Sequence, residues 1–161
     1  MNKSALIVPF LALLLLLPAN IFGRAHASTN HAPKMSSFNL SSQKWKNRVL
    51  LVFAPSSSHP AYQQQMQLFE KYKSSFRDRD LVLVQVVANG KSFANTEQID
   101  SAAAAGLRDD LKVSNQDFCV VLVGKDGGVK RRETTPVQAK AIFDEIDAMP
   151  MRRQEMRERS K

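Results

Sequence analysis

Three short segments of this 161-residue chain are apolar at nearly every position, and this continuity constrains the fold more than any other feature. The segments are VLLVFA at 49–54, LVLVQVV at 81–87 and FCVVLV at 118–123. Successive side chains of a β-strand point to opposite faces, so such runs indicate strands that are covered on both faces. We therefore expect a buried sheet between layers of helices.

A fourth strand is predicted at 129–133, directly after a turn signal formed by Asp126 and Gly127. An Asp-Gly pair suits a tight hairpin, so the third and fourth strands should be antiparallel neighbours. The run of three cations within 129–133 marks this strand as a solvent-facing edge of the sheet.

Three segments between and after these strands show apolar residues at helical spacing. The first has Pro60 in its first turn and apolar residues from 62 to 76, and the second covers about 97–111. The third has a clear start signal, because Thr135 suits the N-cap, Pro136 the first helical position and Gln138 the end of a capping box.

The order of these elements predicts their arrangement. A right-handed crossover through the first helix makes the first two strands parallel neighbours, whereas the hairpin makes the last two antiparallel. The sequence therefore predicts an α/β domain of the thioredoxin-like kind, with a mixed four-stranded sheet and helices on both faces.

The first 27 residues have the composition of a signal peptide. Lys3 precedes an apolar run at 5–17, and Ala25 and Ala27 are small residues at the positions that a signal peptidase reads. The run is too short to span a bilayer comfortably, although a retained membrane anchor is the alternative. We expect cleavage after Ala27 and an exported protein, periplasmic or secreted, with no stable membrane span afterwards.

The rest of the chain divides by composition into a flexible arm at 28–44, one domain at 45–150 and a basic tail at 151–161. The formal net charge is +8, but export argues against nucleic acid as the partner and favours a protein or an anionic envelope component. The tail is interpreted either as a docking segment for such a surface or as a solvated extension, with Glu155 and Arg159 as a supporting pair. The sequence predicts no oligomeric state.

Four strings of the chain resemble one known family. They are WKNRVLLVFAP at 45–55, RDLV at 79–82, VGKDGGVK at 123–130 and IDAMPMRRQEM at 146–156. The chain resembles, over about 45–158, the bacterial DUDES-type domain, a thioredoxin-like domain of unknown function that also occurs in vertebrate secreted matrix proteins of the sushi-repeat and steroid-sensitive kinds. The resemblance implies a fold and an exported location, and it carries over no catalytic residue.

The candidate binding residues follow the first strand, at the carboxyl edge of the predicted sheet: Ser56, Ser57, Ser58 and His59. Ligands of open α/β sheets bind at this edge, and a helix N-terminus attracts anions. Alternatively, Ser57, Ser58 or His59 caps the helix while the others are solvated. The loop lacks the glycines of a serine-hydrolase elbow and the cysteines that a thioredoxin-like enzyme would place here.

The only cysteine of the chain, Cys119, lies within the third apolar run. Burial raises the pKa of a thiol, so an inert core residue is the main interpretation, and a single-cysteine oxidoreductase is the alternative. The segment 114–117, before this strand, contains no proline of the kind that faces the cysteines in thioredoxin-like enzymes. No cluster of Cys and His residues has the spacing of a metal site.

The sequence therefore predicts an exported, redox-inactive binding module of unknown partner, without catalytic residues, metal or cofactor. Two alternatives stay open. One is an atypical thiol oxidoreductase that uses Cys119, and the other is a structural domain with no discrete site.

Overall fold

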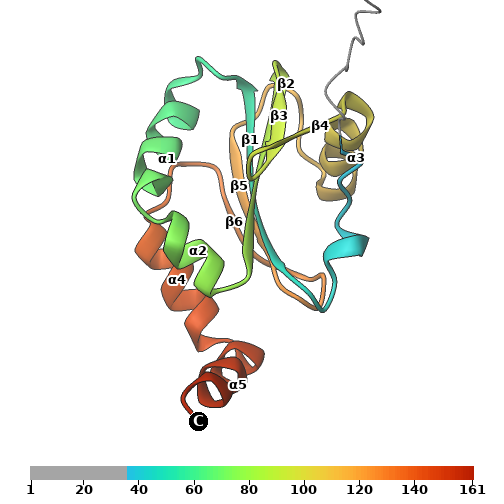
Figure 1. Cartoon of the computed structure of the whole chain (residues 1–161). Coiled ribbons are helices and arrows are strands. Elements are labelled where there is room, and N and C mark those ends of the chain that lie inside the picture. Colours follow the sequence, from blue (N-terminus) through green and yellow to red (C-terminus); the bar gives the residue numbers. More distant parts are fainter. Residues whose placement is uncertain (1–35) are drawn as a thin grey trace, which may run out of the picture. The chain divides into compact units, whose positions relative to one another are not determined.

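The computed structural model describes residues 36–161, so the predicted signal peptide and the first part of the predicted arm lie outside the described residues. Within that range, a six-stranded sheet has the strand order β4-β3-β2-β1-β5-β6 (Figure 1). The strands are β1 (Arg48–Ser56), β2 (Leu81–Asn89), β3 (Ser92–Ala94), β4 (Glu97–Ile99), β5 (Cys119–Val123) and β6 (Val129–Glu133).

The centre of the sheet is β1, which pairs in parallel with β2 and antiparallel with β5. Every side chain from Val49 to Ala54 is at most 1% exposed, as the continuous apolar run predicts. Alternate side chains of β1 pack into two separate hydrophobic cores. Leu50 and Val52 belong to one, and Leu51 and Phe53 belong to the other. The predicted class, an α/β fold with helices on both faces of a mixed sheet, is confirmed.

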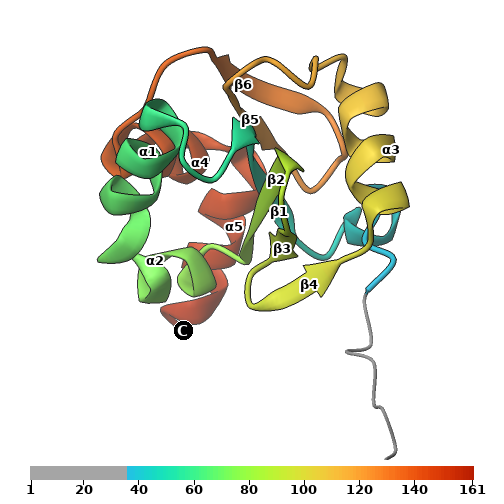
Figure 2. The same cartoon turned by 90° about the horizontal axis from the view of Figure 1, so that it is seen from above.

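Helices on the first face are α1 (Pro60–Glu70), α2 (Lys73–Asp78) and α4 (Ala139–Ala148), while α3 (Ser101–Leu111) lies on the other (Figure 2). The first core packs Phe69, Phe76 and Ile142 against β1, and the second packs Leu107 and Leu111 there. A separate helix, α5 (Pro150–Arg159), follows α4 after a single extended residue, Met149.

The structure has two more strands than the sequence predicted, because a short hairpin, β3 and β4, follows β2. Its turn includes Asn95, which has a φ of 52° and accepts a hydrogen bond from the N–H of Leu83 at its Oδ1 (3.0 Å). The predicted helix at 97–111 therefore begins only at Ser101, where the carboxylate of Asp100 accepts the N–H of Ala103 (2.6 Å). The predicted helix at 62–76 is likewise two helices, α1 and α2.

The predicted start of the last helix at Thr135 is wrong, because α4 begins at Ala139. The reason is the buried side chain of Gln65, which accepts the N–H of Val137 at 2.7 Å and donates to its carbonyl oxygen at 2.9 Å. These two bonds hold the Val137 backbone against α1, outside the helix, and satisfy polar groups that burial would otherwise leave unpaired.

Residues on both sides of the predicted domain also pack onto it. Phe38 and Leu40, from the segment predicted as a flexible arm, lie against the core on the α3 face. At the other end, the predicted basic tail forms most of α5, and Arg152 within it is only 3% exposed. Among residues 36–161, no helix is both long and apolar enough to cross a bilayer.

Candidate binding site at the carboxyl end of the sheet

The predicted loop lies where β1 ends and α1 begins. Ser57 and Ser58 are exposed, and the hydroxyl oxygens of Ser56 and Ser58 lie 3.0 Å apart within hydrogen-bond distance. His59 occupies the N-cap position of α1, but its side chain forms no capping hydrogen bond. Ser57 and Ser58 therefore lie exposed at the start of α1. Of the three residues offered as alternatives for capping this helix, His59 stands at the N-cap position but does not cap through its side chain.

The imidazole of His59 ties this loop to the segment before β5. Its ring stacks on Phe118 with centroids 6.1 Å apart and an interplanar angle of 3°. The Nδ1 atom of His59 is buried and has no hydrogen-bond partner among the described residues. The structure thus brings together two segments that are far apart in the sequence, 55–59 and 114–118.

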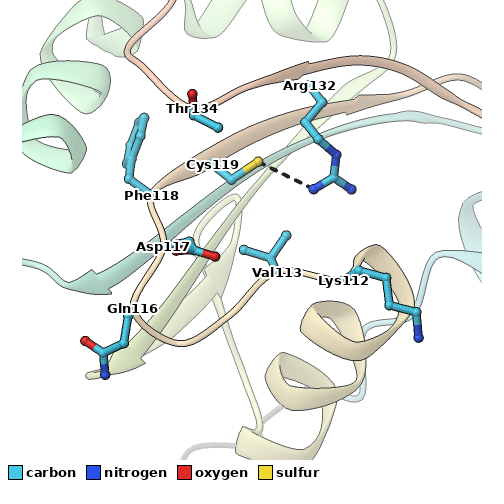
Figure 3. Close-up of a pocket in the computed structure, with 8 residues that line it drawn as sticks. All are labelled: Lys112, Val113, Gln116, Asp117, Phe118, Cys119, Arg132 and Thr134. Carbon is cyan, nitrogen blue, oxygen red and sulfur yellow. Dashed lines mark hydrogen bonds between the residues drawn. The ribbon is translucent and has the colours of Figure 1, made fainter.

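Cys119 follows Phe118 and points to the opposite face of the sheet, into the α3 core. It is 3% exposed, and its Sγ atom lies 3.7 Å from Nη1 of Arg132, toward which it points (Figure 3). Burial raises the pKa of the Cys119 thiol, and the charge of Arg132 only partly counteracts that rise. The thiol therefore stays protonated, which makes it a poor nucleophile.

A cavity of about 330 Å³ opens beside this cysteine. Val113 and Phe118 supply part of its apolar wall, and its polar wall consists of Lys112, Gln116, Asp117, Arg132 and Thr134 (Figure 3). Between residues 36 and 161 no peptide bond is cis, and no group of His, Cys, Asp or Glu side chains is arranged to hold a metal ion. The site offers hydroxyls, two cations and a cavity, which suit binding.

A further polar residue of this end, Arg108 on α3, was missed by the sequence analysis. It is 6% exposed and donates to the carbonyl oxygens of Ala54 (2.8 Å), Val86 (2.9 Å) and Ser114 (2.7 Å). Its pKa is lowered by burial, an effect that Asp117 partly offsets. The helical position of Arg108 could have indicated its burial, because this residue lies beside the apolar stripe of Leu107 and Leu111 and not on the opposite face of the helix.

The other end of the sheet holds a cluster of ion pairs that docks α5. Arg48, which is fully buried, donates to both carboxylate oxygens of Glu155 at 3.1 and 3.2 Å. Lys125 contacts the same carboxylate at 2.9 Å. The predicted pair of Glu155 with Arg159 does not form, because Arg159 contacts Asp78 at 3.0 Å instead.

A comparison with protein families and curated proteins identifies relatives. The family model described as "Domain of unknown function (DUF4174)" matches residues 39–155. "Coiled-coil domain-containing protein 80" of Danio rerio is 30% identical over 133 residues, which cover 73% of this chain and 15% of that protein. "Sushi repeat-containing protein SRPX" of Homo sapiens is 28% identical over 114 residues, which cover 69% of this chain and 25% of that protein. The chain thus spans a quarter or less of these relatives.

Two solved structures resemble this fold. The reduced 2-Cys peroxiredoxin of Plasmodium vivax has a TM-score of 0.55 at 18% identity, covering 73% of this chain and 85% of that one. Thioredoxin peroxidase I of Plasmodium yoelii has a TM-score of 0.51 at 19% identity, covering 71% and 79%. At such low identity the likeness concerns the fold alone, and it confirms the thioredoxin-like prediction.

The relatives also bear on the resemblance that the four strings indicated. A domain of unknown function with a thioredoxin-like fold, and kinship to sushi-repeat proteins, are confirmed. The bacterial origin, the DUDES name and the steroid-sensitive relatives stay predictions.

Proposed function

The chain belongs to the family of the domain of unknown function DUF4174, and on this premise we propose that it is an exported binding module without thiol redox activity. The observation that carries this proposal is the environment of Cys119. The only sulfhydryl of the chain is 3% exposed, and burial raises its pKa. Disulfide exchange needs an accessible thiolate, so this scaffold supplies shape and charge in place of electron transfer.

The binding surface of this proposal is the loop Ser56, Ser57, Ser58 and His59, together with the cavity beside Cys119. Ser57 and Ser58 of the loop are exposed, and His59 stacks on Phe118, which lines that cavity. Lys112 and Arg132 supply two positive charges there against one negative charge from Asp117. This balance favours a partner that is a protein or an anionic envelope component.

Export is supported by the composition of residues 1–27, whose small residues at Ala25 and Ala27 suit a signal peptidase. In an oxidising compartment a lone cysteine cannot close a disulfide within its own chain, which agrees with its burial. The partner therefore belongs to the periplasm or the extracellular space.

A second candidate function is a single-cysteine thiol oxidoreductase. The contact of 3.7 Å between Arg132 and Sγ of Cys119 favours it, because a guanidinium lowers the pKa of a neighbouring thiol. The cavity also reaches this cysteine, so an oxidant would need only a small opening. Burial outweighs Arg132 in setting the pKa, however, and this ranks the candidate second.

Thiol reactivity separates the two functions. We expect a neutral maleimide to label native protein at least about a hundredfold more slowly than urea-unfolded protein, because labelling requires a costly local opening. Peroxide consumption and disulfide reduction should be equal in the wild type and in Cys119→Ser.

Turnover that disappears in Cys119→Ser would instead establish the oxidoreductase. In that case Arg132→Gln should lower the rate, because it removes the cation that contacts the sulfur. Lys130→Gln is the matched control, since it removes a cation from the same strand that contacts Asp126 and not the sulfur.

A further inference from the structure

Arg108 is a buried cation without a carboxylate partner. None of the carboxylates in residues 36–161 lies within ion-pair distance of its guanidinium, which bonds three backbone carbonyl oxygens. The aromatic ring of Phe53, whose centroid is 5.4 Å away, is its other polarisable neighbour. Buried charges in proteins are generally paired with an opposite charge, because desolvation without one is costly.

The three carbonyl contacts leave part of the guanidinium free. Arginine has five N–H donors, and three contacts use three of them, so two remain. Carbonyl oxygens satisfy donors but bring no net negative charge. Burial lowers the pKa of Arg108, and the negative charge of Asp117 offsets this effect only in part.

Arg108 also lines a second cavity, of about 340 Å³, between the β2–β3 turn and α3. Lys91 contributes another cation there, and Ser101 and Asn115 contribute hydroxyl and amide groups. Asp100 is the one carboxylate among the lining residues, and its Oδ1 is engaged by the N–H of Ala103. A volume of this size accommodates a small molecule, and its lining carries a net charge of +1 from two cations and one carboxylate.

We propose that this cavity binds a small oxyanion, a phosphate or carboxylate group, with Arg108 as its buried anchor and Lys91 as its outer cation. The anion supplies the opposite charge that Arg108 lacks, and Ser101 and Asn115 provide further donors. The site is separate from the Ser56–His59 loop and involves no sulfur. Its test is therefore independent of the thiol assay, and either proposal can fail alone.

Titration calorimetry of the purified protein at constant ionic strength tests the site, with inorganic phosphate and succinate as separate probes and chloride as the reference. We expect saturable binding of one anion per chain, and the tighter probe identifies the group that the cavity prefers. Ala105→Glu places a carboxylate on the cavity wall and should weaken binding at least about tenfold. Ala102→Glu is the matched control, an exposed alanine of the same helix outside the lining, and should bind as the wild type does.

A second pair of variants leaves the helix intact. Lys91→Ala should weaken binding about two- to fivefold, the usual contribution of an exposed ion pair, whereas Lys71→Ala should not change it. Two outcomes would overturn the proposal. One is the lack of saturable binding of either probe up to about 10 mM. The other is equal affinity of the Ala105→Glu and Ala102→Glu variants.

Discussion

The two ends of the sheet bury arginine in opposite ways. At the amino end of β1, Arg48 lies in the cluster that docks α5, and the carboxylate of Glu155 faces it at 3.1 and 3.2 Å. At the carboxyl end of β1, the hydrogen-bond acceptors of Arg108 are carbonyl oxygens, including that of Ala54 at 2.8 Å, and no carboxylate contacts it. Both side chains are almost fully buried, so the difference lies in the charge of their partners.

Every cation of the amino end has a carboxylate within ion-pair distance. The ion pairs of this cluster join residues from β1, the end of α2, the segment before β2, the β5–β6 turn, α4 and α5. The cations are Arg48, Arg79, Lys125, Arg152 and Arg159, and the carboxylates are Asp78, Asp80, Asp147 and Glu155. Such a set is complete without a ligand, so its role is to attach α5. At the carboxyl end, by contrast, Arg108 contacts carbonyl oxygens and no carboxylate, and a bound anion would supply that contact.

Removal of a carboxylate from the amino end should have the largest effect. Glu155→Ala leaves the buried Arg48 guanidinium with the carbonyl oxygen of Arg79 as its remaining hydrogen-bond acceptor, and we expect the free energy of unfolding to fall by about 3 kcal/mol. Urea unfolding measures this. Glu158→Ala is the control, because Glu158 is exposed on the same helix and contacts only Gln154, so its effect should stay within about 0.5 kcal/mol. Equal losses in both variants would contradict a structural role for the cluster.

Removal of the arginine at the carboxyl end should cost less. Arg108→Met deprives three buried carbonyl groups of their donors but also eliminates a buried charge without a carboxylate partner, so we expect a loss of about 1–2 kcal/mol. Added phosphate should then stabilise the wild type and not the variant, since only a state that binds the anion gains free energy. Arg77→Met, at an exposed arginine of α2, is the control and should retain the response to phosphate. A larger loss for Arg108→Met than for Glu155→Ala would reverse the comparison.

Each of the four strings that carry the family resemblance contributes a residue to the cluster at the amino end of the sheet. Arg48, Arg79, Lys125 and Glu155 come one from each of the four strings, 45–55, 79–82, 123–130 and 146–156. The cluster itself could not be predicted, because its members are up to 107 positions apart in the chain. The strings that carry the resemblance therefore supply four of the residues that attach α5.

The fold was predictable where a pattern is local and repeated. Continuous apolar runs identified β1, β2 and β5, because strands covered on both faces need such runs. The β3–β4 hairpin was missed, since its strands have only three residues each and present no periodicity. The start of α4 was missed because the hydrogen bonds that set it come from Gln65, 72 positions earlier.

The sequence could predict where the candidate loop lies in the fold, but not which other residues surround it. The end of β1 located the loop at 56–59 through a general rule for α/β sheets. The stacking of His59 on Phe118 and the carbonyl contacts of Arg108 depend on tertiary geometry, which no local pattern encodes. An arginine at an apolar position of a helical stripe is the one signal that sequence analysis could use in similar chains.

Low pH should weaken the ion pairs at the amino end of the sheet and leave the hydrogen bonds of Arg108 to carbonyl oxygens unchanged. Burial alone would raise the pKa of Glu155, but hydrogen bonds from Arg48 and Lys125 outweigh it and lower that pKa below the ordinary 4.5. Because the folded-state pKa is the lower one, this carboxylate stabilises the fold above pH 4.5, and that contribution is lost as the pH falls through the folded-state value. The carbonyl partners of Arg108 do not titrate.

Urea unfolding at a series of pH values from about 6 to 2.5 measures this difference. We expect the free energy of unfolding of the wild type to decrease toward low pH, and Glu155→Ala to show a shallower decrease because its titrating group is gone. Asp147 contributes to the remaining slope, because the opposing effect of burial is outweighed by hydrogen bonds from Arg79 and Arg152, which lower its pKa. Asp126 contributes as well, because the hydrogen bonds from Lys130 and from the N–H of Gly128 lower its pKa. Arg108→Met should keep the full acid response. If Glu155→Ala and Arg108→Met had the same pH profile, the two ends would not be electrostatically distinct, and the contrast between a paired and an unpaired arginine would fail.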